Sequence, residues 1–347
     1  MNMNTKDSFF PVYKNDGYSI LSLNNSQRNG VNSLVYKLNS GEYNFQDNPC
    51  QCGNNSSQDD ILVSEKDMFG IPNRNILCAN CGLIRSEKVL VDSDLSKYYD
   101  EDYKPINYNL SQVSGESYYK SQMYRGKQFY DLLKKHCSIK GDELVYDMGC
   151  GSGGVMHYFN EAGMACKGND YSKEYLEYGN SVGMNLSYGD MNGDGIENNS
   201  VDIFVLSHVY EHLVDTQEYL KRIFSKIKVG GVLIMEVPGV FAEISEKTGY
   251  PLSGCQFAHV INFYHKDFLK SMFEHFGLKV VFGNERCTFI VEKTNTSNFE
   301  TPFNYQNSKE FNRVSNHLQT TTKNYRSVTN KAFIKRKISA LIKGRII

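Results

Sequence analysis

Residues 145–154 place an acidic side chain and a run of glycines directly after an apolar segment. The apolar residues lead into Asp147, and Gly149, Gly151 and Gly153 follow it. Glycine accepts positive φ angles, and it lets the backbone approach a ligand where a Cβ atom would collide. A strand, an acid and a glycine turn in this order predict the first βα unit of a nucleotide-binding α/β domain.

The acid helps to choose between ligands. Gly149, Gly151 and Gly154 also satisfy the dinucleotide pattern G-x-G-x-x-G, so a nicotinamide or flavin site is one interpretation. A carboxylate at Asp147 would repel the pyrophosphate that such a site holds over this loop. S-adenosylmethionine has no phosphate, and it carries a sulfonium and an ammonium group that an acid attracts. Asp147 therefore favours S-adenosylmethionine, with a glycine turn that binds nothing as a third alternative.

The stretch from Asp147 to Gly153, Asp-Met-Gly-Cys-Gly-Ser-Gly, resembles motif I of the class I methyltransferases, D-x-G-C-G-x-G. The resemblance extends over about residues 118–295. It implies an α/β fold with a Rossmann-like sheet, mostly parallel with one antiparallel strand near its edge. It also implies that S-adenosylmethionine is the methyl donor.

The elements that must position this loop follow from alternating helix and strand patterns after about residue 118. Residues 201–207 are nearly continuously apolar, as a strand buried on both faces requires. We expect a helix at 218–228, ended by Gly230-Gly231, and another at 268–276, ended by Gly277. The expected strands are 143–147, 165–169, 186–188, 201–207, 232–237, 278–282 and 288–291.

Polar residues stand at the ends of consecutive expected strands, where open α/β sheets bind their ligands. The resemblance implies that Asp170 accepts hydrogen bonds from the ribose hydroxyls. It further implies that Asp190 accepts one from the adenine amino group while the backbone of Met191 covers the ring. Any one acid could instead be a loop residue or a helix N-cap. The predicted donor-binding residues are Asp147, Gly149, Gly151, Gly153, Asp170, Tyr171, Asp190, Met191 and Ser207.

The segment after residue 207, His-Val-Tyr-Glu-His-Leu, resembles the Glu-His-Leu signature of a subgroup that includes quinone O-methyltransferases and sugar methyltransferases. Methyl transfer needs positioning of the reactants and a base for the acceptor proton. His212 is the expected base, and Glu211 would orient it or hold a cation. His259 lies in a segment that resembles the family's H-x-x-x-F stretch beside the acceptor, so it is a second candidate base.

His208, Glu211 and His212 also match a peptidase-type zinc motif, H-x-x-E-H, but their place after a buried strand argues against peptidase chemistry. Some O-methyltransferases of the subgroup hold a divalent ion through E-x-x-E-H. Here His208 takes the first acidic position, and this departure disfavours that metal. The remaining alternative is that Glu211 and His212 only pack at a helix start.

Two cysteine pairs, each followed by glycine, precede this region. Cys50 and Cys52 are spaced C-x-C, and Cys78 and Cys81 are spaced C-x-x-C. The pattern resembles a zinc ribbon whose four thiolates would bind a structural zinc ion, with the first pair one residue short. Together with Cys-Gly-Leu-Ile at 81–84 and L-x-x-Y-Y-x-x-x-Y from Leu95, it resembles bacterial methyltransferases with an N-terminal zinc ribbon. These include deoxysugar C-methyltransferases and enzymes of surface-polysaccharide clusters.

The chain has 347 residues and a formal charge of −1, so no global field attracts nucleic acid. Nine cysteines without a signal-peptide core favour a cytoplasmic protein. We expect an irregular lead-in at 1–45, a zinc-ribbon-like module at 46–90, a connector at 91–117, the methyltransferase domain at 118–295 and a tail at 296–347. Residues 331–347 suit a basic amphipathic helix, which would touch a membrane surface or else remain solvated or pack in an oligomer.

The sequence thus predicts a methyltransferase whose acceptor is a sugar or nucleotide-sugar hydroxyl in surface polysaccharide biosynthesis. Alternatives within the class are C-methylation of a keto-deoxysugar and quinone-type O-methylation of a small molecule. A nicotinamide-dependent enzyme and a binding module without catalysis are the alternatives from other classes.

Overall fold

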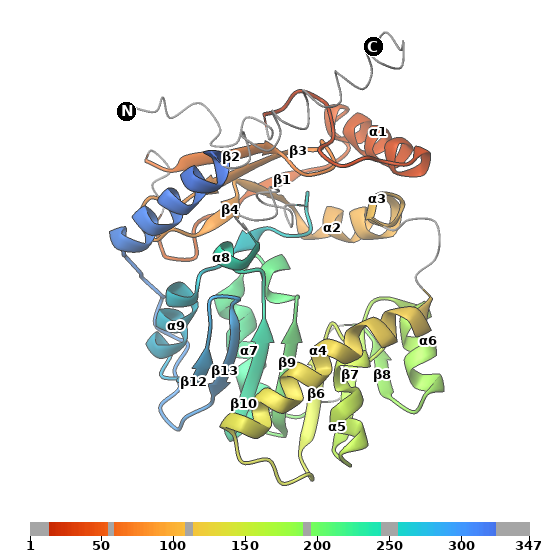
Figure 1. Ribbon diagram of the computed structural model, residues 1–347, viewed down its shortest axis with the longest axis vertical. Helices are drawn as coiled ribbons and strands as arrows, with labels where there is room; N and C mark the ends of the chain where they lie inside the picture. The colour runs from red at the N-terminus through yellow and green to blue at the C-terminus, as the bar shows by residue number, and fades with distance from the viewer. Residues whose placement is uncertain (1–13, 55–58, 108–113, 190–195, 244–255, 324–347) are drawn as a thin grey trace.

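The computed structural model describes residues 14–54, 59–107, 114–189, 196–243 and 256–323. Its largest element is a seven-stranded sheet in the order β12-β13-β10-β9-β6-β7-β8 (Figure 1). Only β13 runs antiparallel to its neighbours. The strands are β6 Leu144–Met148, β7 Ala165–Asp170, β8 Asn185–Tyr188, β9 Val201–Ser207, β10 Ile227–Glu236, β12 Lys279–Gly283 and β13 Thr288–Glu292. The predicted fold class, a mostly parallel Rossmann-like sheet with one antiparallel strand, is confirmed.

Both faces of this sheet are covered because its central strands are apolar on both sides. In β9, Phe204 and Leu206 face one core, and Ile203 and Val205 face the other. The first core is shared with α7 Thr216–Lys226 and α9 Lys266–His275. The second core is shared with α4 Gly115–His136, α5 His157–Glu161 and α6 Lys173–Ser181.

The helix expected at 218–228 ends earlier than predicted. Helix α7 stops at Lys226, and β10 begins at Ile227. Gly230 and Gly231 therefore lie inside the strand, at an irregularity between Ile227 and Val232 in its pairing with β9. Gly230 has φ of +82°, so the glycine pair serves a bulge and does not end the helix.

A smaller, mixed unit lies above the carboxyl edge of the large sheet (Figure 1). Its strands form the order β11-β4-β3-β2 and a separate pair, β1-β5. The strands are β1 Phe45–Asp47, β2 Ile61–Lys66, β3 Pro72–Leu77, β4 Ile84–Ser86, β5 Lys88–Leu90 and β11 Asn262–Phe263. Strand β11 lies within residues 118–295, outside the module predicted at 46–90, so a strand from the larger predicted domain joins the sheet of the small unit.

The helices of this unit correct two expectations. The lead-in expected to be irregular contains α1 Asn25–Asn39, which begins with a capping box formed by Asn24 and Gln27. The connector expected at 91–117 contains α2 Asp92–Tyr98, a π-helical turn η2 at Tyr99–Tyr103, and α3 Lys104–Asn107. Helix α2 and the turn η2 bring the rings of Tyr98, Tyr99 and Tyr103 into contact with one another.

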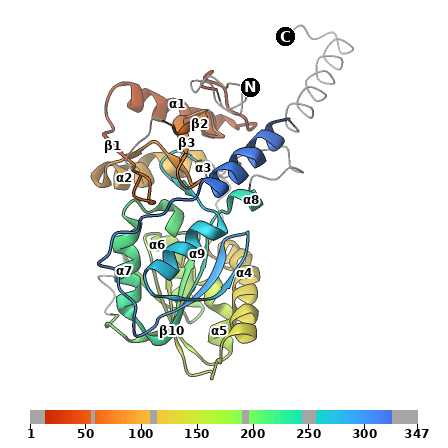
Figure 2. The ribbon, with the colours of Figure 1, turned by 90° about the vertical axis from the view of Figure 1, so that its left-hand side faces the viewer.

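The chain then returns to the small unit. After β13, residues 308–323 form a helix that packs beside β2, β3, β4 and α8 Val240–Glu243 (Figure 2). Within the described residues, no helix combines the length and the apolar character needed to cross a membrane. The amphipathic helix predicted at 331–347 lies outside the described residues.

Candidate active site

Asp147 stands at the carboxyl end of β6, directly before the glycine loop. It is fully buried, and neither of its oxygens has a hydrogen-bond partner among the described residues. Burial raises its pKa well above the usual range, and the charge of Asp170 adds to the effect. An unpaired buried carboxylate is costly unless something cationic compensates it. The ammonium group of S-adenosylmethionine has the required chemistry, so this residue fits the predicted donor.

The glycine loop can take its shape only with glycine at its first two predicted positions. Gly149 and Gly151 have φ of +73° and +55°. A Cβ atom on Gly149 would lie 2.6 Å from Val209, and one on Gly151 would lie 2.3 Å from the ring of Tyr118. Gly153 also has positive φ, +82°. The loop therefore offers bare backbone beside Asp147.

The next strand end supplies a second carboxylate. Asp170 accepts hydrogen bonds from the backbone N–H groups of Gly151 and Ser172, one on each oxygen, at 2.9 and 2.8 Å. Each oxygen keeps further acceptor capacity, which suits a pair of ribose hydroxyls. Tyr171, which follows it, is 67 % exposed and meets Tyr188 edge to face. The predicted partners Asp190 and Met191 lie outside the described residues.

A charged cluster occupies the ends of β9 and β10. His208, at φ +55°, places Nδ1 3.1 Å from Glu211 and Nε2 3.5 Å from Glu236. Burial alone would lower the pKa of His208, but these carboxylates raise it to about 9. Burial would raise the pKa of Glu236, yet His208, Thr288 and Arg125 lower it to about 2. An imidazolium therefore stands where the metal-binding motif would carry an acid.

Two unpaired oxygens border this cluster. The second oxygen of Glu211, Oε2, is buried without a hydrogen-bond partner among the described residues, as is the hydroxyl of Ser207. Glu211 is only 1 % exposed. Ser207 is the last residue of β9 and Glu211 follows four residues later, so both groups lie at the carboxyl end of this strand, where they can meet polar groups of a bound molecule.

His212 is held through both of its ring nitrogens. It lies in the short 3-10 turn η4 Tyr210–His212. Nδ1 faces the carbonyl oxygen of His259, and Nε2 lies 3.1 Å from that of His208. A carbonyl oxygen only accepts hydrogen bonds, so neither nitrogen offers a lone pair to a substrate in this geometry.

His259 stacks on His212 at 4.0 Å between ring centroids. Its Nδ1 lies 2.9 Å from the hydroxyl of Tyr99, and its Nε2 lies 3.2 Å from that of Tyr103. Burial lowers the pKa of His259 well below its ordinary value, and the neighbouring charges of His212 and His208 lower it further. A neutral imidazole can donate to one tyrosine and accept from the other, so both contacts are satisfied.

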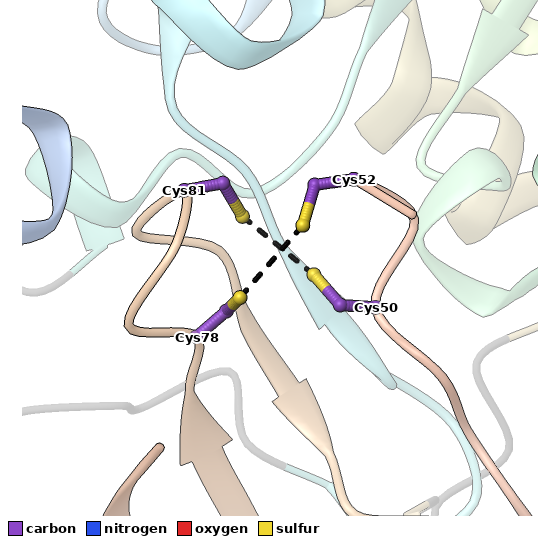
Figure 3. Close-up of side chains that lie close together, drawn as sticks. All are labelled: Cys50, Cys52, Cys78 and Cys81. Carbon is purple, nitrogen blue, oxygen red and sulfur yellow. Dashed lines mark hydrogen bonds between the residues drawn. The ribbon is translucent and has the colours of Figure 1, made fainter. Parts of the chain in front are cut away.

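The four predicted metal ligands come together (Figure 3). Cys50 and Cys52 follow β1, and Cys78 and Cys81 stand in the turn between β3 and β4. All four are buried and lie within 4.8 Å of one another, with Sγ–Sγ distances of 3.6 Å for Cys50–Cys81 and 3.8 Å for Cys52–Cys78. Zinc–sulfur bonds of about 2.3 Å in a tetrahedron place sulfur atoms about 3.8 Å apart. The cluster therefore fits zinc despite the short C-x-C spacing.

One other group among the described residues has potential metal ligands, namely His265, Asp267 and Glu310. The ring of His265 is already engaged, because Nε2 lies 2.9 Å from the carbonyl oxygen of Cys81 and Nδ1 accepts from the N–H of Phe268. Arg313 further pairs with both acids. These residues are better explained as a link between the cysteine turn and α9.

Several residues of the site were not predicted. Glu236 is the last residue of β10 and lies one residue before the end of the strand predicted at 232–237, so the rule that singled out Asp170 could have found it. Tyr99 and Tyr103 belong to the noted tyrosine pattern, but nothing in the sequence pairs them with His259. Arg125 lies on a helix before the first strand and is 3.4 Å from Glu236. No motif around Arg125 indicates that it lies near the site.

Residues 122–281 match a family model described as a methyltransferase domain. No curated protein matches the chain. Similar solved structures include a complex between the Haloferax volcanii Trm112 methyltransferase activator and a methyltransferase (16 % identity, 50 % of this chain and 77 % of that chain, TM-score 0.42). Others are S-adenosylmethionine-dependent methyltransferases from Aquifex aeolicus (15 %, 57 % and 95 %, 0.37) and Archaeoglobus fulgidus (19 %, 54 % and 78 %, 0.37). The family model covers 160 of the 347 residues, and each of these solved structures is similar to only part of the chain.

Proposed function

We propose that this chain, whose residues 122–281 match a model of a methyltransferase domain, uses S-adenosylmethionine to methylate a hydroxyl group of a sugar or nucleotide-linked sugar. The observation that carries the proposal is the neutral His259 held between the hydroxyls of Tyr99 and Tyr103, next to the charged cluster of His208 and Glu211. A sugar carries several hydroxyl groups, each of which can donate and accept hydrogen bonds with polar side chains such as these. Surface polysaccharide biosynthesis is the setting that the sequence resemblance suggests.

On the donor side, Asp147 would hold the ammonium group and Asp170 the ribose hydroxyls. The electrophilic methyl group is what S-adenosylmethionine supplies when bound. Since a sulfonium already activates that carbon, the protein mainly orients the acceptor and removes its proton. Arg125 stands near enough to the acidic cluster to balance its charge.

On the acceptor side, we assign the base to His259, acting through a tyrosine. A tyrosine hydroxyl can donate to a ring nitrogen of His259 while its oxygen accepts from the acceptor hydroxyl. As the acceptor oxygen bonds to the methyl carbon and the carbon–sulfur bond breaks, the acceptor proton passes to the tyrosine oxygen and the tyrosine proton to His259. His212 would then orient His259, since its ring faces the His259 carbonyl. Glu211 Oε2 can accept from a second acceptor hydroxyl.

Substitutions can distinguish the proposed roles of His259 and His212. His259→Gln should slow methyl transfer by roughly 10²–10⁴-fold, the usual effect of losing a positioned base. His212→Gln should have a smaller effect, and both variants should bind S-adenosylmethionine with nearly unchanged affinity by calorimetry. If the larger loss follows His212, that residue is the base.

The acceptor class is tested by incubating the protein and S-adenosylmethionine with a panel of nucleotide sugars, free sugars and quinols. Released S-adenosylhomocysteine reports turnover, and mass spectrometry of the product locates the methyl group. Methylation at a sugar oxygen is the expected result. Turnover restricted to quinols, or a methyl group found on carbon, would contradict the hydroxyl assignment.

The cysteine cluster is proposed to bind one structural zinc ion. In support, Asn80 and Asn54 direct amide N–H groups toward the sulfurs of Cys52 and Cys78, at 3.6 and 3.7 Å.

A further inference from the structure

Asp67 is a buried carboxylate that the proposed chemistry does not use. It is 1 % exposed and begins the turn between β2 and β3. Its Oδ1 accepts from the backbone N–H groups of Phe69 and Ile71, both at 2.9 Å, and so closes the turn. Its Oδ2 accepts a hydrogen bond of 3.0 Å from the backbone N–H of Phe257, a residue 190 positions later in the chain. One oxygen therefore serves the turn and the other reaches the acceptor side of the large domain.

Phe257 is held on both sides of its backbone by the small unit. Its N–H donates to Asp67, and its carbonyl oxygen accepts from the hydroxyl of Tyr98 at 2.9 Å. Its ring packs edge to face against Tyr98 and Phe45, at 5.6 and 6.2 Å between centroids. The position of Phe257 is thus determined by residues that precede the methyltransferase domain.

Ala258 connects Phe257 directly to His259, so the place of Phe257 affects the place of His259. Ala258 has φ of +53°, a strained conformation for a residue with a Cβ atom. Such strain persists only where neighbours hold the backbone on both sides. On the far side His259 meets two tyrosines, and the N–H of Ile261 donates to the carbonyl of Glu211 at 3.2 Å.

The burial of Asp67 has a cost that the turn alone does not explain. Burial raises the pKa of Asp67 to about 7, against the four backbone N–H groups of Phe257, Ile71, Phe69 and Gly70 that lower it. A turn at the surface could use the same carboxylate in contact with water. Among the described residues, the hydrogen bond to Phe257 is the one that joins the Asp67 side chain to a segment outside its own turn.

We propose that Asp67 is a positioning residue for methyl transfer: through Phe257 it sets the place of His259 between Tyr99 and Tyr103. The small unit then contributes to catalysis as one wall of the acceptor site. The consequence for rate rests on the proposed role of His259, whereas the positional link does not.

Asp67→Asn separates the two functions of the carboxylate. Its single oxygen can still accept from Phe69 and Ile71, while its amide NH₂ group would face the N–H of Phe257, donor against donor. In the full-length protein, exchange of the Phe257 amide should become roughly tenfold faster. The ring ¹⁵N signals of His259, identified by their loss in His259→Gln, should titrate at higher pH than in the wild type. Calorimetry should give donor affinity within about twofold of the wild type, because Asp67 touches none of the donor residues.

Two further variants keep the test decisive. Tyr98→Phe removes the other hydrogen bond to Phe257 and should shift His259 in the same direction, which covers the case in which Asp67→Asn fails to fold. Ser64→Ala removes a buried hydroxyl of the same β2–β3 pair that contacts Asn75 at 2.8 Å, and it should leave His259 unchanged. Wild-type His259 signals in Asp67→Asn or Tyr98→Phe, or an equal shift in Ser64→Ala, would overturn the proposal. Since no acceptor is present, failure of the sugar assignment would not alter these readings.

Discussion

Asp147 has opposite effects on the stability of the donor-free protein and on the proposed binding of the donor. Its carboxylate is buried with no partner among the described residues, which disfavours the protein without donor. The same isolation leaves both oxygens ready for a cationic ligand. If Asp147 holds the ammonium group as proposed, it stabilises the complex with the donor at the expense of the free protein.

Asp147→Asn should accordingly raise the unfolding free energy of the donor-free protein by about 1–2 kcal/mol, because a neutral amide loses less on burial than a carboxylate. It should weaken S-adenosylmethionine binding by about 10- to 100-fold, since a charge-assisted contact is lost. Urea unfolding and calorimetry measure the two effects. A variant that is less stable and binds equally well would contradict the assignment of Asp147 to the ammonium group.

His208 should make stability depend on pH. Its pKa is raised from 6.5 to about 9 by Glu211 and Glu236, against the effect of burial. A raised folded-state pKa contributes stability that is complete below about pH 6.5 and is lost as the pH rises through 9. His208→Gln should therefore lower the unfolding free energy more at pH 6 than at pH 10.

Urea unfolding of both proteins at the two pH values tests this expectation. His275→Gln is a matched control, because the contacts of the His275 ring among the described residues are with the Thr301 carbonyl and two phenylalanine rings. An effect of His208→Gln that is equal at both pH values would show that the imidazole is not charged in the folded protein.

At the scale of elements, the turn between β3 and β4 joins the cysteine cluster to the site. Cys78 and Cys81 lie in this turn, and β4 pairs with β11 just after His259. The N–H of Ser86 also donates to the carbonyl of Ile261 at 2.9 Å. A metal ion that orders the turn would therefore order the acceptor wall as well.

Purified protein should contain about one zinc ion per chain, and Cys78→Ser should lose both the zinc and thermal stability. Elemental analysis and thermal unfolding check the two outcomes. Cys137→Ser, a substitution of a half-buried cysteine outside the cluster, should keep the zinc. Metal-free protein prepared without chelator, or an equal loss in both variants, would contradict the zinc site.

At the scale of the whole molecule, residues 303–323 bind the two units together. The N–H of Tyr305 donates to the carbonyl of Cys52 at 3.1 Å, and that of Asn307 to the carbonyl of Asn80 at 2.8 Å. The helix that follows buries Val314 and Leu318 completely, in a cluster with residues of β2, β3, β4, α8 and β11. The C-terminal segment is thus part of the small unit's core.

Leu318→Ala should lower the unfolding free energy by about 2–4 kcal/mol, because it leaves a cavity in that cluster. Asn312→Ala changes an exposed residue of the same helix and should have an effect within about 0.5 kcal/mol. Denaturant unfolding compares the two variants. If Leu318→Ala is as mild as Asn312→Ala, the helix does not contribute to the core.

The sequence by itself determined the large sheet and most of its ligand-facing edge. Continuous apolar runs such as Val201–Ser207 specify buried parallel strands, and polar residues at their carboxyl ends meet at one edge of the sheet. Asp147 and Asp170 could be predicted as donor-binding residues in this way because the chemistry and the spacing are local. The cysteine cluster could likewise be predicted, because two pairs of cysteines are each followed by a glycine.

Only the tertiary structure decided how the proposed acceptor side is assembled. Its contacts join residues far apart in the chain, as with Tyr99 and His259 or Asp67 and Phe257. No periodicity records such pairs, because each partner's local pattern is satisfied whichever distant segment it meets. The contacts of a histidine are decided in the same way: the ring nitrogens of His212 face carbonyl oxygens, whereas those of His259 face tyrosine hydroxyls.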